Sequence, residues 1–319
     1  MTDEYEVVDA LEKREQRRVR RRDLFSGFAA ASTAAGGFVL ANQAGPVMAQ
    51  SVSDADILNF ALNLEYLEAQ FYVQAATGMG LPENLLGGSG TRGQATGGRR
   101  VNFTDTAVAQ YAREIAADEQ AHVAFLRQAL GSAVVAQPTI DIGTSPTGAF
   151  STAARAAGLI GPGQSFDPYA NDENFLLAAY IFEDVGVTAY KGASPLISNA
   201  TFLEAAAGIL AVEAYHASLV RTTLYAKGLQ TPSLIDASIA ISNARDSLDG
   251  QSDLDQGLTT SRMSGGVASN IAPLDENGIA FSRSAGQVLN IVYLNNMAVT
   301  GGGFFPNGVN GTLRMSASN

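Results

Sequence analysis

The chain has 319 residues, of which 46% are hydrophobic and 16% are charged, a balance typical of folded globular proteins. Its formal net charge of −11 argues against nucleic acid or an anionic membrane surface as the main partner. The chain contains no cysteine, which excludes disulfides, thiolate zinc sites and iron–sulfur clusters. Any bound metal must therefore be held by oxygen atoms and imidazole nitrogens.

Residues 1–50 have the pattern of an export signal. Arg21 and Arg22 precede two hydrophobic residues, a weakly apolar Ala/Gly-rich run follows, and residues 47–49 are suited to cleavage. This pattern resembles a twin-arginine signal, which implies export of the folded protein by the twin-arginine machinery to the periplasm or the extracellular space. The alternative is a single-pass membrane anchor, which Gly36 and Gly37 within the run disfavour.

Four segments of the remaining chain repeat apolar residues with helical period. We expect helices over about 53–76, 104–130, 172–191 and 201–228. Ser53 with Asp56, and Thr201 with Glu204, have the spacing of capping boxes. The predicted inward positions on the last three helices are Val108, Tyr111, Ile115, Phe125 and Ala129; Leu176, Ala179, Gly186 and Tyr190; and Leu203, Ala206, Leu210, Ala217, Val220 and Leu224.

The connections between these helices are unequal in length. A Gly-rich stretch joins the first two, a short loop with Pro195 joins the last two, and about forty residues separate the second from the third. Two helical hairpins joined by one long crossover is the connectivity of ferritin-like bundles. The sequence therefore predicts an all-α fold, with a four-helix bundle over residues 51–228.

Residues 229–319 are expected to form a mixed or irregular extension that packs on the bundle. Residues 234–248 predict a fifth helix, and the segment GQVLNIVYL predicts a short helix or strand. Asp249, Asp253 and Asp255 have the chemistry of calcium ligands, but their spacing fits no EF-hand loop. We expect a solvated acidic loop there.

The chain has only two histidines, and each follows a glutamate by three residues: Glu119 with His122, and Glu213 with His216. Residues three apart on a helix point to the same side, and here that side is the apolar one. Glu65 on the first helix also lies among apolar neighbours that face the core. Glu68 points in a similar direction and could replace or supplement Glu65 as a ligand, but Glu65 is preferred because it keeps the offset to the tyrosine.

Glu183 occupies the corresponding place on the third helix, so four carboxylates point into the core. Burying them together requires protons or cations, and two divalent ions would balance four negative charges. Carboxylates with imidazoles suit iron or manganese, with zinc as an alternative. Tyr72 follows Glu65 and Tyr190 follows Glu183 by the same offset of seven, so we expect both tyrosines in the core just outside the ligands.

With these motifs the chain resembles the ferritin-like superfamily. The segments NFALNLEYLEAQFY and AFSRSAGQVLNIVYL are similar to exported bacterial ferritin-like proteins and to plant desiccation-related proteins. The resemblance implies that Glu65 and Glu183 are terminal ligands and that Glu119 and Glu213 bridge two metal ions. It also implies that His122 and His216 each bind one metal.

The expected function is that of a dimetal protein that reacts with oxygen or peroxide in oxidative or desiccation stress. Manganese-dependent peroxide dismutation and ferroxidase chemistry are both open at this point. A structural or protective stress protein, with a stabilising metal or none, is the alternative from another class, and iron storage in a cage is a third. A homo-oligomer is compatible with each of these.

Overall fold

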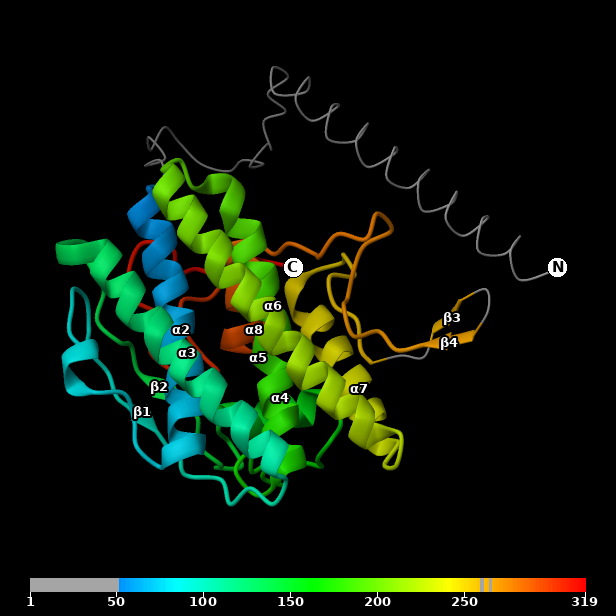
Figure 1. Ribbon diagram of the computed structural model, residues 1–319. Coiled ribbons are helices and arrows are strands. Elements are labelled where there is room, and N and C mark those ends of the chain that lie inside the picture. The colour runs from blue at the N-terminus through cyan, green and yellow to red at the C-terminus, as the bar shows by residue number, and fades with distance from the viewer. Residues whose placement is uncertain (1–51, 259–260, 264–265) are drawn as a thin grey trace. The chain divides into compact units, whose positions relative to one another are not determined.

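The computed structural model describes residues 52–258, 261–263 and 266–319 (Figure 1). The predicted export signal, residues 1–50, lies outside the described residues. Labels follow Figure 1.

Four long helices form the centre of the structure, and they lie where the sequence pattern predicts them. They are α2 (Asp54–Thr77), α3 (Thr106–Leu130), α5 (Asp172–Ala193) and α6 (Ala200–Gly228). Helix α2 packs along α3, and α5 packs along α6; the two hairpins join through contacts of α2 with α5 and of α3 with α6. The predicted all-α, two-hairpin bundle is thereby confirmed.

Side chains cap the starts of these helices, because the first amide groups of a helix have no partner within it. Ser53 and Asp56 form the predicted capping box at α2. The capping box predicted for Thr201 and Glu204 is wrong. Helix α6 begins one residue earlier, and the Asn199 side chain accepts hydrogen bonds from the amides of residues 201 and 202.

Two predicted inward positions are also wrong: Phe125 on α3 is 45% exposed and Leu203 on α6 is 38% exposed. The buried stripe of α3 instead runs through Val108, Ala112, Ile115, Val123 and Leu126. Helices α3 and α6 each pack one face against the rest of the bundle. A side chain at the edge of that face, such as Phe125 or Leu203, therefore reaches solvent.

The long crossover between α3 and α5 has structure of its own. It contains α4 (Ala149–Ala156) and β2 (Ile140–Asp141), which pairs in parallel with β1 (Ala95–Thr96) from the Gly-rich stretch. Short 3-10 turns lie at Glu83–Leu85, Gly131–Ala133 and Ser194–Leu196. Phe150 of α4 packs against Phe71 of α2 and Phe182 of α5, with ring centroids 5.5 and 5.7 Å apart. The crossover therefore contributes to the core.

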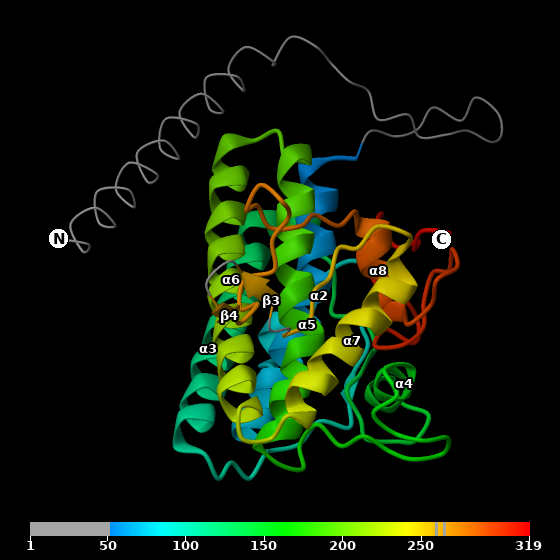
Figure 2. The same ribbon diagram turned by 90° about the vertical axis from the view of Figure 1, so that its right-hand side faces the viewer.

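The extension after α6 folds back on the bundle. It contains α7 (Ser233–Asp249), the antiparallel pair β3 (Ser261–Met263) and β4 (Gly266–Ala268), and α8 (Ala285–Tyr293). Figure 2 shows α4, α7 and α8 on the side of the bundle away from α3. Phe304 in the tail packs its ring 5.0 Å from that of Phe182, so the extension completes the aromatic core.

A buried ion network joins the extension to α5 and α6. Its members are three arginines and three aspartates: Arg221, Arg245, Arg283, Asp184, Asp249 and Asp255. Nη2 of Arg245 lies 2.9 Å from Asp184 Oδ2 and 2.6 Å from Asp255 Oδ1. Arg283 holds Asp249 through Nε at 2.6 Å and Asp255 through Nη2 at 3.0 Å.

This network corrects the expectation of a solvated acidic loop. Asp253 is exposed, but Asp249 and Asp255 are buried and paired with arginines. The partner of both, Arg283, lies about thirty residues further along the chain. The local sequence pattern shows the acidic residues but not the arginine that buries them.

Among the described helices, α6 is long and apolar enough to cross a membrane by length and composition. The midpoint of that helix carries Glu213 and His216, both buried within the bundle. In this structure α6 packs against α5, α3 and α7 as one of the four bundle helices.

We predict that Arg283→Met destabilises the protein by about 3–5 kcal/mol, because it leaves Asp249 buried without its arginine and removes one of the two arginines that bind Asp255. The measurement is the free energy of unfolding from urea denaturation. The matched control is Arg92→Met, which breaks an exposed pair with Glu83 and should cost less than about 1 kcal/mol. Equal losses in the two variants would contradict a structural role for the network.

Candidate metal centre

The six predicted ligands come together in the middle of the bundle. Two groups have ligand atoms within 4.8 Å of one another: Glu65, Glu119, His122 and Glu213 in the first, and Glu119, Glu183 and His216 in the second. All are buried, and the most exposed of them, His122, is only 9% accessible. Glu119 belongs to both groups, whereas Glu213 belongs to one. This geometry favours Glu119 as the residue shared by two ions.

Both histidines direct Nδ1 at the carboxylates. Nδ1 of His122 lies 3.2 Å from Glu65 Oε2 and 3.5 Å from Glu119 Oε2. Nδ1 of His216 lies 3.0 Å from Glu119 Oε1. On the other side of the His216 ring, Nε2 lies 3.2 Å from Asp118 Oδ2, and the Asp118 side chain is 43% exposed. A carboxylate on the far nitrogen fixes the orientation of an imidazole ligand.

Six buried atoms in this cluster have no hydrogen-bond partner among the described residues. They are both carboxylate oxygens of Glu119 and of Glu213, Oε2 of Glu183, and Nδ1 of His216. The close approach of His216 Nδ1 to Glu119 lacks the angles of a hydrogen bond. Buried polar atoms without partners are rare and costly, and here they converge on one small volume. Oxygen and nitrogen atoms that converge in this way fit divalent cations.

The two tyrosines bond crosswise between the hairpins. The Tyr72 hydroxyl donates to Oε1 of Glu183, and the Tyr190 hydroxyl donates to Oε1 of Glu65. Each tyrosine therefore orients the glutamate of the opposite helix, and one oxygen of that glutamate remains directed at the centre. The repeated Glu–Tyr offset of seven residues thus corresponds to a reciprocal pairing of α2 with α5.

Glu68 lies beside the centre without joining either group. It is 5% exposed and lines a small apolar cavity of about 20 Å³ together with Gly186 and Phe304. A Cβ atom added to Gly186 would lie 2.3 Å from Glu213 Oε2 and 3.5 Å from Glu68 Oε1. The glycine therefore makes room for two carboxyl groups. The sequence pattern places Gly186 on the inward stripe but does not show this role, which only its position three residues after Glu183 hints at.

Burial raises the pKa values of most of these carboxyl groups. Burial and the charge of Glu119 raise the pKa of Glu65 to about 7. Burial likewise raises the pKa of Glu183 to about 8, and it raises the pKa values of Glu68 and Glu213 well above their usual range. Burial also opposes ionisation of Glu119, but contacts with both histidines outweigh it and hold that pKa at about 2.

The pKa values of both histidines are raised, which favours their charged form. Burial lowers their pKa values, but the surrounding carboxylates outweigh it and raise the pKa of His122 to about 11 and that of His216 to about 9. In the metal-free protein the centre therefore holds protons in place of cations, and metal binding must release them.

The four-helix bundle and its buried carboxylate–histidine centre are the features of one protein family. The chain belongs to the ferritin-like family, whose ferritin-like domain profile matches residues 53–226. The family resemblance expected from the sequence is thereby confirmed.

Two curated relatives match most of the chain. The desiccation-related protein PCC13-62 of Craterostigma plantagineum is 32% identical over 247 residues, which cover 73% of this chain and 75% of that protein. The ferritin-like catalase Nec2 of Nesocodon mauritianus is 28% identical over 273 residues, which cover 82% of this chain and 85% of that protein. No solved structure matches the chain significantly.

We predict that the metal-free protein loses stability as the pH rises from 6 to 9. Glu65, Glu183, His122 and His216 have folded pKa values above their ordinary ones, so the unfolded chain binds fewer protons in this range. Calorimetric melting of chelator-treated protein measures the effect. Glu183→Gln removes one of these groups and should make the decline shallower. A melting temperature that stays constant or rises over this range would contradict the electrostatics described.

Proposed function

We propose that this protein holds two divalent ions of a redox-active metal, iron or manganese, and breaks down hydrogen peroxide. The observation that carries the proposal is the set of unpartnered buried atoms around Glu119, which belongs to both ligand groups. Four carboxylates and two imidazoles without a thiolate suit these metals. The name of the catalase relative points to the same chemistry.

In this proposal Glu65, Glu213 and His122 hold one ion, Glu183 and His216 hold the other, and Glu119 binds both. Two such ions would supply two electrons to one peroxide and recover them from a second, giving water and oxygen. The hydroxyl groups of Tyr72 and Tyr190 keep Glu183 and Glu65 in the orientation that ion binding needs.

The surroundings of the centre favour a small neutral substrate over a hydrated ferrous ion. Every ligand is at least nine-tenths buried, and the cavity beside Glu68 is lined mainly by aliphatic and aromatic side chains. Resident ions lose their water shells once, on loading, but a ferrous substrate would have to do so against such walls in every turnover, whereas peroxide is neutral and small. This supports peroxide dismutation over ferroxidase activity or iron storage.

Glu68 has a defined part in this proposal. Burial, together with Glu119 and Glu65, raises the pKa of its carboxyl group well above the usual range, which favours the protonated form of Glu68. Its position at the cavity lets it donate that proton to an oxygen atom of a molecule that enters there, and recover one afterwards.

The relative named for desiccation supports a second candidate function, a protective protein whose metal stabilises the fold without turnover. Both candidates share the same ligands and differ in reactivity. A protein that binds metal but does not react with peroxide would favour the protective function.

We predict that the mature protein, residues 51–319, binds about two metal ions and that Glu119→Gln abolishes both, because this residue belongs to both groups. Glu65→Gln and Glu183→Gln should each retain about one ion. Elemental analysis after metal loading and gel filtration measures the content. Retention of both ions by Glu119→Gln would refute the shared role.

We predict that the metal-loaded protein evolves oxygen from peroxide and that Gly186→Ala abolishes this, because the added Cβ would displace Glu213. An oxygen electrode measures the rate. The matched control is Gly208→Ala on α6, where a Cβ would meet nothing within 4 Å. The control should keep full activity and gain up to about 1 kcal/mol of stability. A fully loaded protein without oxygen evolution would refute catalase function but not metal binding.

A further inference from the structure

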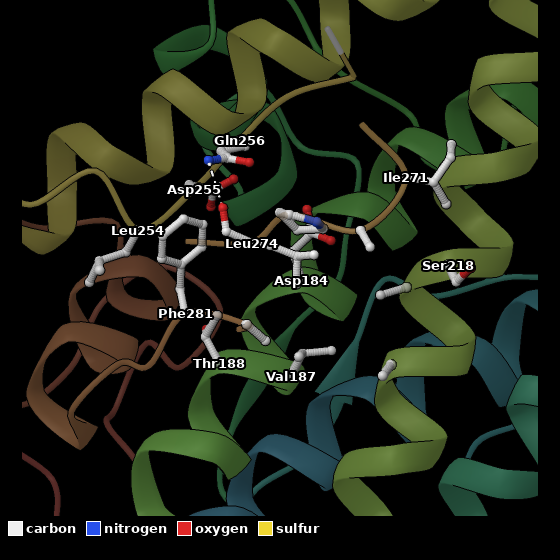
Figure 3. A pocket seen from close by; sticks show the side chains of 15 residues that line it. Asp184, Val187, Thr188, Ser218, Leu254, Asp255, Gln256, Ile271, Leu274 and Phe281 are labelled. Carbon is white, nitrogen blue, oxygen red and sulfur yellow. Dashed lines mark hydrogen bonds between the residues drawn. The ribbon is translucent and has the colours of Figure 1, made fainter. Parts of the chain in front are cut away.

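Two cavities lie between the bundle and the extension, and they differ in size and in neighbours. The larger, of about 140 Å³, has Val187 and Thr188 of α5 and Phe281 of the extension in its wall (Figure 3). No ligand predicted for the metal centre lines it. The smaller, of about 20 Å³, is the cavity beside Glu68. Of the two, the smaller cavity is therefore the one whose size bears on the centre.

Glu68 supplies the one polar side chain in the wall of the smaller cavity. Apart from Gly186, every other residue that lines it is aliphatic or aromatic. Glu68 is only 5% exposed. Its oxygen atoms are not among the completely enclosed atoms without partners, unlike those of Glu119 and Glu213, so a molecule in the cavity can reach them. The cavity thus offers one hydrogen-bonding group within apolar walls.

The volume of this cavity limits what can lie beside Glu68. A single water molecule needs about 10–15 Å³ of such space, whereas a cavity of about 150 Å³ holds benzene. The space beside Glu68, about 20 Å³, therefore suits a molecule hardly larger than water. Gly186 also lines it, and a Cβ atom there would lie 2.3 Å from Glu213 Oε2. A molecule in the cavity is thus close to a carboxylate of the centre.

The extension forms one wall of this cavity and holds it in place. Ile291 and Val292 of α8 and Phe304 of the tail line the cavity, and all three are buried. The Phe304 amide donates to the Val292 carbonyl at 2.9 Å, and the Phe304 carbonyl accepts from the Asp141 amide at 2.9 Å. The Phe304 ring packs 5.0 Å from that of Phe182. Side chains held in this way cannot withdraw for a larger molecule without loss of packing.

We propose that the extension makes the centre selective for hydrogen peroxide against organic hydroperoxides, with Ile291, Val292 and Phe304 as the residues that set the size limit. This inference rests on the peroxide chemistry of the proposed function. Hydrogen peroxide is close to water in size and can form a hydrogen bond with the Glu68 carboxyl group, whereas an alkyl group would overlap the wall at α8. One methylene group in a pocket of fixed size changes enzyme selectivity by about 10–200-fold.

A competition between hydrogen peroxide and ethyl hydroperoxide, added together to the metal-loaded mature protein, tests the size limit. Reduction of ethyl hydroperoxide cleaves its O–O bond and takes two electrons from the metal pair, and hydrogen peroxide returns them as it is oxidised. The overall reaction consumes one molecule of each and gives ethanol, water and oxygen. The measured quantity is the ratio of ethanol to oxygen.

We expect Val292→Ala, which removes two methyl groups from the wall, to raise this ratio at least about tenfold. The matched control is Val288→Ala, the same change at a buried position of α8 that does not line the cavity, and it should keep the wild-type ratio. An unchanged ratio in Val292→Ala, with oxygen evolution intact, would overturn the inference and leave the catalase function standing.

Diffraction from xenon-pressurised crystals of the metal-free protein measures the size limit without turnover. Apolar cavities bind xenon when they are large enough, so we expect xenon beside Glu68 in Val292→Ala but not in the wild type or in Val288→Ala. Xenon at this place in the wild type, or its absence there in Val292→Ala, would overturn the inference. A loaded wild type that evolves no oxygen, with the expected xenon pattern, would refute the catalase function while the size limit holds.

Discussion

Five carboxyl groups and two imidazoles buried in the middle of a helical bundle are the constraint on which the rest of this structure depends. Ionised carboxylates lose their hydration when they are buried, at a cost that close packing alone cannot offset. The fold compensates with hydrogen bonds from two tyrosines, with contacts from two histidines, and with raised pKa values that favour the protonated forms of Glu68 and Glu213. Divalent cations would replace those protons and satisfy the unpartnered oxygens.

The same constraint explains why the bundle needs its extension. Adjacent residues on a helix point about 100° apart, so Glu183 faces the metal centre while Asp184 faces the other side of α5. A four-helix bundle alone would leave Asp184 at the surface. The extension instead supplies Arg245 to bond it, and its own aspartates are held by Arg283. Helix α5 is thus buried on both sides, between two polar clusters.

The sequence predicted the four bundle helices and the six residues that meet at its centre because both depend on spacing within single helices. Residues three or seven apart share a side, so the pairing of Glu119 with His122 and the offset between Glu65 and Tyr72 carry the geometry directly. The buried ion network depends on Arg283 meeting Asp249, far apart in the chain, and no periodic pattern records such a contact. The exposure of Phe125 was missed because the width of a buried stripe depends on neighbouring helices.

The two halves of the centre differ at one position of α2 and α5, and this difference has a physical cause. Helices α2 and α5 share the order of glutamate and, seven residues on, tyrosine, but position three after the glutamate is Glu68 in one and Gly186 in the other. Glycine inside a helix costs about 0.5–1 kcal/mol relative to alanine, so its presence calls for a compensating gain. Here the space left by the missing side chain holds the carboxyl groups of Glu213 and Glu68. A second glutamate at position 186 would compete with both for that volume. The two halves of the bundle can therefore share one centre only because one half omits the side chain that the other supplies.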